Sequence, residues 1–503
     1  MQKSMLCEQP YLMIPVWPGA ALQTLTITAE GENPFTLRVR VPESGAGQPA
    51  YLAPVPCKGV QGQTITLAGA FAPEFFEKVV LADTPPAPPR GKRPLVHFAP
   101  DNGWLNDPNG LVRHDGVWHL YFQHNPFNVD WENMSWGHAE STDLLHWTQR
   151  DTALWPDETG AMFSGSGIVN EQGLLGQKPD TLAFFYTAAG GVEHPAPGRH
   201  YTQHVAVSAD NGRTLQKLPC GVIDTICEEN RDPKVFYHPE TRAWILVMWL
   251  ENDDFGIYRS TDLEHWSQSQ RLTLAGGFEC PDLVRFETEA GERWAFFAAD
   301  GRYWPGRFDG YGFTAEGESH LLYALATLPY AAQTYSNAGK RKILVPWLRT
   351  KTVDTFTGMM GVPMELHMDA GGLLHSDFVR ELYAEAVVIT ERTAPLAEPL
   401  CYTPVKRLAV LIELADSADG CARITLGGEV LDIQPDAIVY AGECIPLQTP
   451  VCDAAILLDQ NILEIHANHG ILSVAVQTQW QAGSMPVSIT APGTKRVCIR
   501  VIE

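Results

Sequence analysis

Three short acidic motifs contain the residue types that acid–base and nucleophilic chemistry requires. They are Asn106-Asp107-Pro108-Asn109-Gly110, Arg231-Asp232-Pro233 and Glu279-Cys280-Pro281-Asp282. Cleavage of a glycosidic bond, for example, needs one carboxylate that attacks or stabilises the anomeric carbon and one carboxylic acid that protonates the leaving oxygen. Such a pair would be available if the fold brought the three motifs into one pocket.

Each motif also has a purely structural explanation when it is taken alone. The run Asp-Pro-Asn-Gly at 107–110 is typical of a tight turn, because all four residue types favour turn geometry. Arg231 followed by Asp232 is more often a structural ion pair than part of a catalytic site. Spacing alone does not decide between Glu279 and Asp282 as the acidic residue of the third motif.

The acidic motifs belong to a longer internal repeat. Asp107, Asp232 and Asp282 are each followed, at nearly equal spacing, by a strand-like run that carries a tryptophan: Trp118, Trp244 and Trp294. In step with this, Ser-Thr-Asp-Leu-Leu-His-Trp at 141–147 recurs almost unchanged at 260–266, and weakly from Ser208. A unit of roughly 50 to 60 residues with several strands has the size of one propeller blade.

The repeat predicts an all-β protein in four parts. Units that begin at Trp104, Phe163, Arg231, Glu279 and Gln333 give five blades. We therefore expect a small N-terminal β-domain at 1–82, a Pro-rich linker at 83–94, a five-bladed β-propeller at 95–385 and a C-terminal β-sandwich at 390–503. Innermost propeller strands converge on one axis, which would bring the acidic motifs together.

Composition excludes several classes of partner and compartment. The 503 residues carry 36 Lys plus Arg against 59 Asp plus Glu, a net charge of −23 that disfavours nucleic acid and anionic membranes. Ten cysteines without a CxxC pair are expected to be reduced core residues. Prolines at 15 and 18 interrupt the first apolar stretch, so no secretion signal is expected, and the predicted location is cytoplasmic.

Neither a metal nor a cofactor is expected. The sixteen histidines include no HExxH motif and no Cys/His cluster, so His119 and His124 are interpreted as strand residues rather than metal ligands. Trp244, Trp249 and Trp294 lie in apolar runs and are predicted to be core residues rather than sugar platforms.

Five segments, in order, resemble the signatures of glycoside hydrolase family 32, which comprises invertases, inulinases and levanases. They are Trp104–Gly110, Trp136–Ala139 with Ser141 and Asp143, Phe163–Ser166, Arg231–Val235 and Glu279–Leu283. The resemblance covers residues 95 to about 380, and 463–470 are similar to a strand and turn of the family's C-terminal sandwich. It implies that the propeller is the catalytic domain.

The resemblance also implies a role for each site residue. Asp107 would be the nucleophile, Glu279 the general acid/base and Asp232 the transition-state stabiliser, in a double displacement that retains the anomeric configuration. Arg231 is expected to help keep Asp232 charged. The residues that would line the fructose pocket are Asn106, Gln123, Trp131, Phe163, Ser164 and Arg231.

Departures from the family pattern fall in the fifth blade. Leu328-Pro329 stands where the family usually has Asp-Phe, and Pro363-Met364-Glu365 stands where it usually has Pro-Arg-Glu. These departures leave the three acidic residues intact, but they put in doubt what the fifth blade contributes to the pocket and to leaving-group selectivity.

The leading hypothesis is a β-fructofuranosidase that releases terminal fructose from sucrose or short fructo-oligosaccharides. Alternatives in the family are an exo-inulinase, an exo-levanase or a fructosyltransferase. Outside it, the alternatives are a non-catalytic fructan-binding propeller and an inverting five-bladed hydrolase of pentose polymers. The partner expected is a small sugar, and self-association into a homo-oligomer stays open.

Overall fold

The structure of the protein is a computed structural model. It describes residues 1–88, 91–191, 196, 200–219, 221–324, 327–393, 396–404, 408–417, 422–447, 450–481, 485–492 and 494–503. Strands dominate this part of the chain, and its two helices have six residues each. The all-β prediction is confirmed. Neither helix has the length and hydrophobicity that crossing a lipid bilayer requires.

Two small sheets form at the N-terminus and share one core. The first has the order β1 (Gln2–Leu6), β6 (Thr64–Gly69), β3 (Leu22–Ala29), β4 (Phe35–Arg40), and the second β5 (Tyr51–Pro56), β2 (Tyr11–Val16), β7 (Val80–Ala82). Helix α1 (Pro73–Lys78) adds Phe75 and Phe76 to the core. Alternating burial along β4 and β6 lets one face of each strand contact this core.

Residues 103–378 form five sheets whose strands, apart from the short β27, are antiparallel and come from consecutive stretches of the chain. The first contains β11 (Thr148–Leu154), β10 (Ser135–Ser141), β9 (Val117–Asn125), β8 (Gly103–His114) and β27 (Phe356–Thr357). The second contains β12 (Ala161–Asn170), β13 (Thr181–Ala189), β14 (Tyr201–Ser208) and β15 (Gln216–Lys217). The third contains β16 (Arg231–His238), β17 (Ala243–Glu251), β18 (Asp254–Ser260) and β19 (Ser267–Thr273).

The last two sheets complete the set and return the chain to its start. The fourth contains β20 (Asp282–Thr288), β21 (Gly291–Phe297), β22 (Arg302–Phe308), β23 (Phe313–Ala315) and β24 (His320–Leu321). The fifth contains β25 (Pro329–Thr334), β26 (Ile343–Leu348), β29 (Met364–Met368), β30 (Leu374–Phe378) and β28 (Met359–Met360). β27, between these strands in sequence, pairs in parallel with β8 of the first sheet.

Hydrophobic clusters join each of the five sheets to the next, and the fifth to the first. Several inner strands, such as β13 and β17, are buried along almost their whole length, as expected for strands covered on both faces. Pairs that meet in these clusters are Trp136 with Phe184, Phe185 with Leu246, Val247 with Phe296, Phe297 with Leu344, and Phe122 with Val345. The five sheets therefore pack in a closed order.

Two six-stranded sheets at the C-terminus pack face to face. One has the order β31 (Val387–Arg392), β42 (Thr494–Ile502), β33 (Ala409–Ser417), β38 (Ala454–Asp459), β39 (Ile462–Ala467), β40 (Leu472–Gln477). The other has the order β32 (Leu396–Tyr402), β41 (Val487–Ala491), β34 (Ala422–Leu426), β35 (Glu429–Ile433), β36 (Ala437–Tyr440), β37 (Glu443–Pro446). One buried cluster contains residues of both sheets, which makes the pair a sandwich.

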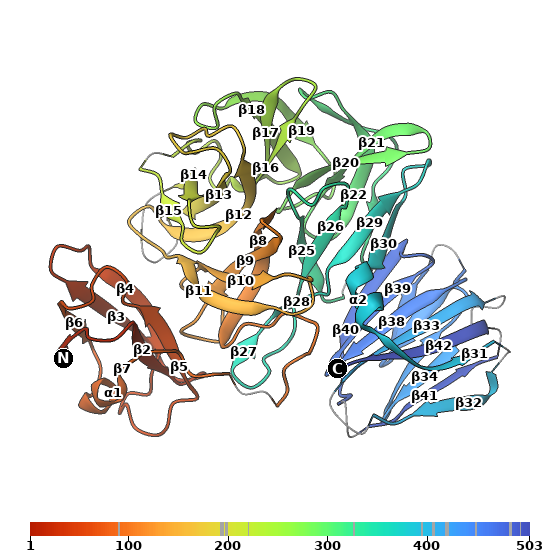
Figure 1. Ribbon diagram of the computed structural model, residues 1–503, viewed down its shortest axis with the longest axis horizontal. Coiled ribbons are helices and arrows are strands. Elements are labelled where there is room, and N and C mark those ends of the chain that lie inside the picture. The colour runs from red at the N-terminus through yellow and green to blue at the C-terminus, as the bar shows by residue number, and fades with distance from the viewer. Residues whose placement is uncertain are drawn as a thin grey trace.

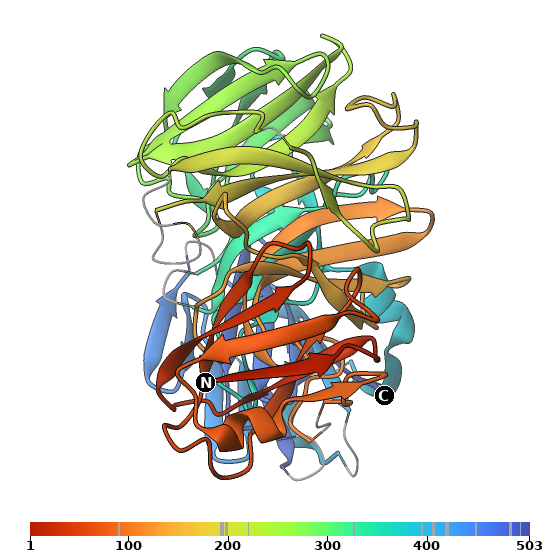
Figure 2. The ribbon, with the colours of Figure 1, turned by 90° about the vertical axis from the view of Figure 1, so that its left-hand side faces the viewer.

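The N-terminal sheets and the C-terminal sheets lie on opposite sides of the five central sheets. Figure 1 shows the N-terminal sheets in red at one side and the C-terminal sheets in blue at the other. Helix α2 (Arg380–Glu385) leads from the fifth sheet into the C-terminal sheets. Turned by 90°, the molecule has the N-terminal sheets in front, with the central sheets rising above them (Figure 2).

The repeated Ser-Thr-Asp-Leu heptapeptide is a turn. Ser141 Oγ accepts hydrogen bonds from the N–H groups of Asp143 and Leu144, and one Asp143 oxygen accepts those of Leu145 and His146. The copy at 260–266 makes the same set of bonds. Both turns follow the third strand of a sheet. The repeat therefore marks the same turn in two of the five sheets, and its polar side chains accept hydrogen bonds from backbone N–H groups.

Several predictions about single residues can now be compared with the structure. Trp244, Trp249 and Trp294 are buried in sheet cores, as predicted, and His119 and His124 both lie in β9. The cysteine prediction was partly wrong. The eight described cysteines are free thiols, but Cys401, Cys444 and Cys452 are exposed, because they lie on or beside strands of the C-terminal sandwich that face solvent. The other two, Cys220 and Cys421, lie outside the described residues.

Candidate active site

One cavity of about 380 Å³ collects the predicted site residues. All nine of them line it: Asn106, Asp107, Gln123, Trp131, Phe163, Ser164, Arg231, Asp232 and Glu279. They come from the first four of the five sheets or the segments that lead into them. Tertiary structure thus brings together residues that are more than a hundred positions apart.

The same backbone irregularity recurs in four of the five sheets, and in three of them it contains site residues. The first strand of each of these sheets shifts register against the second strand, between Leu105 and Pro108 in β8, Met162 and Gly165 in β12, Arg231 and Lys234 in β16, and Tyr330 and Gln333 in β25. A bulge bends its strand and redirects the side chains inside it. Asp107, Ser164 and Asp232 each lie within such a bulge.

Positive φ angles accompany the bulges around the acidic residues. Asp232 has φ +64°, Glu279 +50° and Cys280 +41°. Non-glycine residues rarely adopt this region, and such strain concentrates at functional sites, where the surrounding structure holds it. Here Asp232 N–H donates to Thr187 Oγ1 at 3.1 Å, and Cys280 N–H donates to Asp232 Oδ2 at 3.0 Å.

A chain of polar groups orients Asp107. Trp104 Nε1 donates to Asn106 Oδ1 at 2.8 Å, and Asn106 Nδ2 donates to Asp107 Oδ1 at 3.0 Å. The other carboxylate oxygen accepts from Ser164 Oγ at 2.7 Å. Burial raises the pKa of Asp107, and these two hydrogen bonds oppose that rise. The carboxylate is therefore fixed in place but incompletely compensated, as a buried nucleophile would be.

Among the described residues that line the cavity, Arg231 is the one cation beside four carboxylates, and it lies closer to Glu279 and Glu229 than to Asp232. Its Nη2 atom donates to Glu279 Oε1 at 2.5 Å, whereas its nearest approach to Asp232 is 3.9 Å. Its guanidinium also lies over the Trp249 ring, 4.1 Å from the centroid. The positive charge of Arg231 lowers the pKa of Asp232, in the direction expected from the sequence. Burial outweighs Arg231, and the pKa of Asp232 rises to about 7.

Cys280 lies between two of the acidic groups, although the sequence analysis gave it no role. Its Sγ is 3.7 Å from Asp107 Oδ2 and 3.5 Å from Asp232 Oδ2, and both oxygens are placed to accept from the thiol. Burial raises the pKa of this thiol well above its ordinary value, and the two carboxylates add to the rise. A neutral thiol therefore separates the two carboxylates.

The fifth sheet contributes to the cavity despite its unusual sequence. Tyr330 OH donates to Glu279 Oε2 at 3.0 Å, and Trp347 also lines the cavity. Neither residue was predicted from the sequence. Interpretation of this region rested on the departure from the family pattern at Leu328-Pro329, and the aromatic residues that follow were not considered. Trp104, Tyr201 and Glu229 line the cavity as well and were not predicted to do so. The only sequence signal for Trp104 was its place in the first acidic motif.

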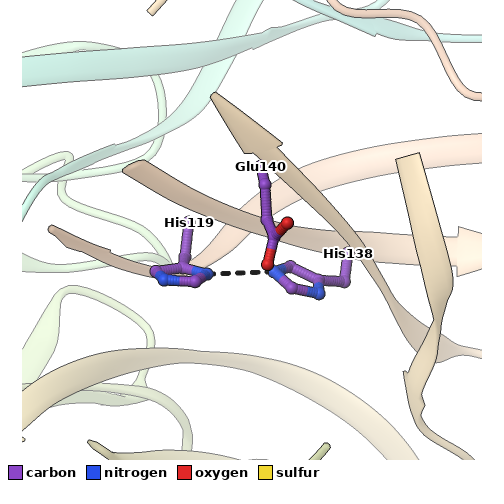
Figure 3. Close-up of side chains that lie close together, drawn as sticks. All are labelled: His119, His138 and Glu140. Carbon is purple, nitrogen blue, oxygen red and sulfur yellow. Dashed lines mark hydrogen bonds between the residues drawn. The ribbon is translucent and has the colours of Figure 1, made fainter. Parts of the chain in front are cut away.

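A second cluster of ionisable side chains lies on β9 and β10. His119 Nδ1 and His138 Nε2 are 3.1 Å apart, and the Glu140 carboxylate points toward them (Figure 3). Glu140 already accepts from Arg150 at 2.7 Å, and His138 Nδ1 has no hydrogen-bond partner among the described residues. Metal-bound histidines normally have such a partner, and a cation here would lie near Arg150. The arrangement favours neutral histidines: burial lowers the pKa of His119 to about 4 and that of His138 well below its ordinary value.

Comparison with known proteins identifies the central part of the chain. The family model "Glycosyl hydrolases family 32 N-terminal domain" matches residues 97–377. An invertase of Debaryomyces hansenii is 33% identical over 277 residues, which are 51% of this chain and 52% of the invertase. A levanase of Bacillus subtilis is 34% identical over 284 residues, which are 51% of this chain and 41% of the levanase. The chain spans about half the length of the curated relatives it matches.

Solved structures show the same fold over a larger part of the chain. The crystal structure of the exo-inulinase from Aspergillus awamori matches with a TM-score of 0.72 at 22% identity, over 82% of this chain and 99% of the exo-inulinase. A fructofuranosidase from Schwanniomyces occidentalis in complex with fructosylnystose has a TM-score of 0.70 at 21% identity, over 82% of this chain and 98% of its own.

Proposed function

Because the chain belongs to glycosyl hydrolase family 32, we propose that it is a retaining β-fructofuranosidase that releases terminal β-fructosyl units from sucrose or short fructo-oligosaccharides. One observation carries the proposal: Asp107, Asp232 and Glu279 line a single cavity, with Asp107 held by Asn106 and Ser164. Two converging carboxyl groups are what a double displacement at an anomeric carbon requires.

The proposed reaction has two steps. In the first, an Asp107 oxygen attacks the anomeric carbon of the fructosyl unit, the glycosidic bond breaks, and Glu279 gives its proton to the leaving oxygen. In the second, Glu279 takes a proton from water, the resulting hydroxide attacks the same carbon, and Asp107 is released. Asp232, whose pKa of about 7 lies well above its ordinary value, would accept hydrogen bonds from fructosyl hydroxyl groups.

We infer that the five central sheets are the blades of a propeller that spans residues 95–385, with the cavity at its axis. The closed packing order of the sheets supports this architecture, as do the bulges that recur in four of their first strands. A propeller funnel that is closed at one end would suit attack on a terminal fructosyl unit. Residues 1–82 and 390–503 would be the flanking β-domains.

Related activities stay alternatives within the same chemistry. Relatives named levanase and extracellular exo-inulinase match about as well as the invertase, so longer fructans are candidate substrates. Transfer of fructose to a sugar instead of water would use the same Asp107 intermediate. A non-catalytic binding protein has no physical use for the intact carboxyl set. An inverting hydrolase of pentose polymers would yield the opposite anomer.

The test is fructose release from sucrose, kestose, inulin and levan by the wild type, Asp107→Asn and Glu279→Gln. Glu289→Gln, which removes an exposed carboxylate between β20 and β21, is the matched control. We expect the wild type and the control to release fructose, and each site variant to lose at least about two to three orders of magnitude. A silent wild type, or site variants with full activity, would contradict the proposal.

Location and assembly are separate proposals. We propose a cytoplasmic enzyme, although several relatives have "extracellular" in their names. Cell fractionation followed by immunoblotting would decide the location. Sedimentation velocity over a range of concentrations would decide whether copies of the chain associate.

A further inference from the structure

Trp131 lies at the mouth of the cavity on a segment that the N-terminal sheets hold. Its side chain is 45% exposed and packs edge-to-face against Phe163, with the ring centroids 6.0 Å apart. Resting on the proposed function, we propose that residues 1–82 are a positioning domain: they fix the segment 126–133 so that Trp131 presents its ring to a sugar unit entering the cavity. The family model begins only at residue 97, after these sheets.

The apolar side chains of the segment belong to the N-terminal core. Phe127 and Val129 are buried in the same cluster as Leu12, Ile14 and Leu37 of the N-terminal sheets. The contact continues to Trp155, whose ring packs against Phe127 at 6.0 Å and against Phe35 of β4 at 5.3 Å. Removing the N-terminal sheets would expose Phe127, so point substitutions are a cleaner test than a deletion.

Polar contacts join the next residues of the segment to strand β4. Asn133 accepts a hydrogen bond from the Arg38 N–H and donates one to the Arg38 carbonyl, both at 2.8 Å. Two ion pairs flank this contact, Arg38 with Glu132 at 3.3 Å and Arg40 with Asp130 at 3.4 Å. The residues on both sides of Trp131 are therefore attached to β4, and the Trp131 ring alone turns toward the cavity.

Asn125 closes the base of the segment from inside the first sheet. Its Nδ2 donates to the Asp130 carbonyl at 2.9 Å, and its Oδ1 accepts from Phe127 N–H and Asn133 Nδ2 at 3.1 and 3.0 Å. Asn133 thus links Asn125 and β4. Its φ of +46° is one that asparagine and glycine tolerate, which makes Asn133→Gly a substitution that keeps the backbone and removes the link.

An aromatic ring fixed at a pocket mouth favours binding, because no conformational freedom has to be lost when the sugar arrives. Loosening it lowers affinity for the bound substrate and transition state alike, which raises KM and leaves kcat unchanged. A raised KM with an unchanged kcat therefore indicates a positioning role. Loss of the folded state would instead lower the fraction of active enzyme and with it the apparent kcat.

The experiment compares Asn133→Gly, Trp131→Ala and the double variant in the full chain with sucrose and kestose. We expect KM to rise about five- to tenfold in Asn133→Gly with kcat within twofold, to rise further in Trp131→Ala, and not to rise again when Asn133→Gly is added to Trp131→Ala. Tyr11→Phe is the matched control: it removes a 3.0 Å bond from the N-terminal sheets to Asp151, away from the segment, and should leave KM unchanged.

Amide hydrogen exchange of residues 126–133 measures how firmly the segment is held and does not depend on enzymatic activity. We expect faster exchange there in Asn133→Gly and no change in Tyr11→Phe. Unchanged exchange, or equal KM effects of Asn133→Gly with and without Trp131, would overturn the inference. A wild type that releases no fructose would instead overturn the proposed function, while exchange still decides whether the N-terminal sheets hold the segment.

Discussion

Two buried clusters of ionisable groups, one in the cavity and one between the central and C-terminal sheets, show how differently burial can act on a carboxylate. In the cavity, Arg231 is the one described cation beside the carboxylates of Asp107, Glu229, Asp232 and Glu279, and it pairs with the last three. In the second cluster, His97 bridges Asp459 at 2.9 Å and Glu464 at 2.7 Å, and all three are buried.

The difference lies in the donors. Asp459 accepts the N–H groups of Leu95, Val96 and His97 as well as the His97 ring, and its pKa falls below the ordinary value although it is fully buried. Asp107 and Asp232 have fewer donors and more negative neighbours, and their pKa values rise. A buried carboxylate with enough hydrogen-bond donors can stabilise an interface. One with too few donors keeps a raised pKa and is available for chemistry.

The largest effect is expected where compensation is most complete. Asp459→Asn removes the charge that faces His97 and the backbone of residues 95–97, so the free energy of unfolding should fall by about 3–5 kcal/mol. Urea unfolding measures it. Asp432→Asn breaks an exposed strand pair with Arg423 and should cost no more than about 1 kcal/mol. Equal losses in the two variants would remove the contrast between the clusters.

In the cavity the same substitution should have the opposite effect on stability. Asp232→Asn is expected to lower fructose release by about 10²- to 10³-fold, because a group that stabilises the transition state is lost. At pH 8 it should also raise the free energy of unfolding, since ionised Asp232, with a pKa near 7, is unfavourable in the fold. Kinetics and urea unfolding of the same preparation test both. A destabilised, active variant would be the contrary result.

The pH dependence of stability separates the clusters as well. Burial alone would lower the pKa of His97, but its two carboxylate partners raise it to about 9, above its ordinary 6.5. Its contribution, roughly 3 kcal/mol, is therefore complete below pH 6.5 and is lost as pH rises to 9. His97→Gln should flatten the melting temperature between these values. A wild type whose melting temperature stays level there would argue against a charged His97.

The smallest effect concerns one charge acting on another inside the cavity. Burial is the main cause of the raised pKa of Asp232, and the negative charge of Glu279 adds to it. Glu279→Gln should lower this pKa, and NMR titration of ¹³C-labelled aspartate carboxyl groups measures the change. Glu289→Gln serves as the control. If the pKa of Asp232 is unchanged in both variants, the charge of Glu279 does not raise it.

Local patterns predicted the fold class and most of the site, for reasons that particular residues illustrate. Alternating and aromatic runs specify strands, and the recurring Ser141 and Ser260 turns mark where sheets repeat. The acidic motifs lie where first strands begin, so their convergence follows from the repeat. The exposure of Cys401 and the links of Tyr330 and Cys280 to the acidic groups could not be predicted, because they depend on which strand faces which.

By itself, the sequence determined that this chain is all-β, that its centre is repetitive and that three acidic motifs recur at matching places. Only the tertiary structure decided that Arg231 lies nearer Glu279 than Asp232, that His97 lies between Asp459 and Glu464, and that β4 contacts the residues on both sides of Trp131. The reason is physical: strand propensity and turn chemistry act between near neighbours in the chain, whereas pKa values and side-chain positions depend on distances between atoms that only folding brings together.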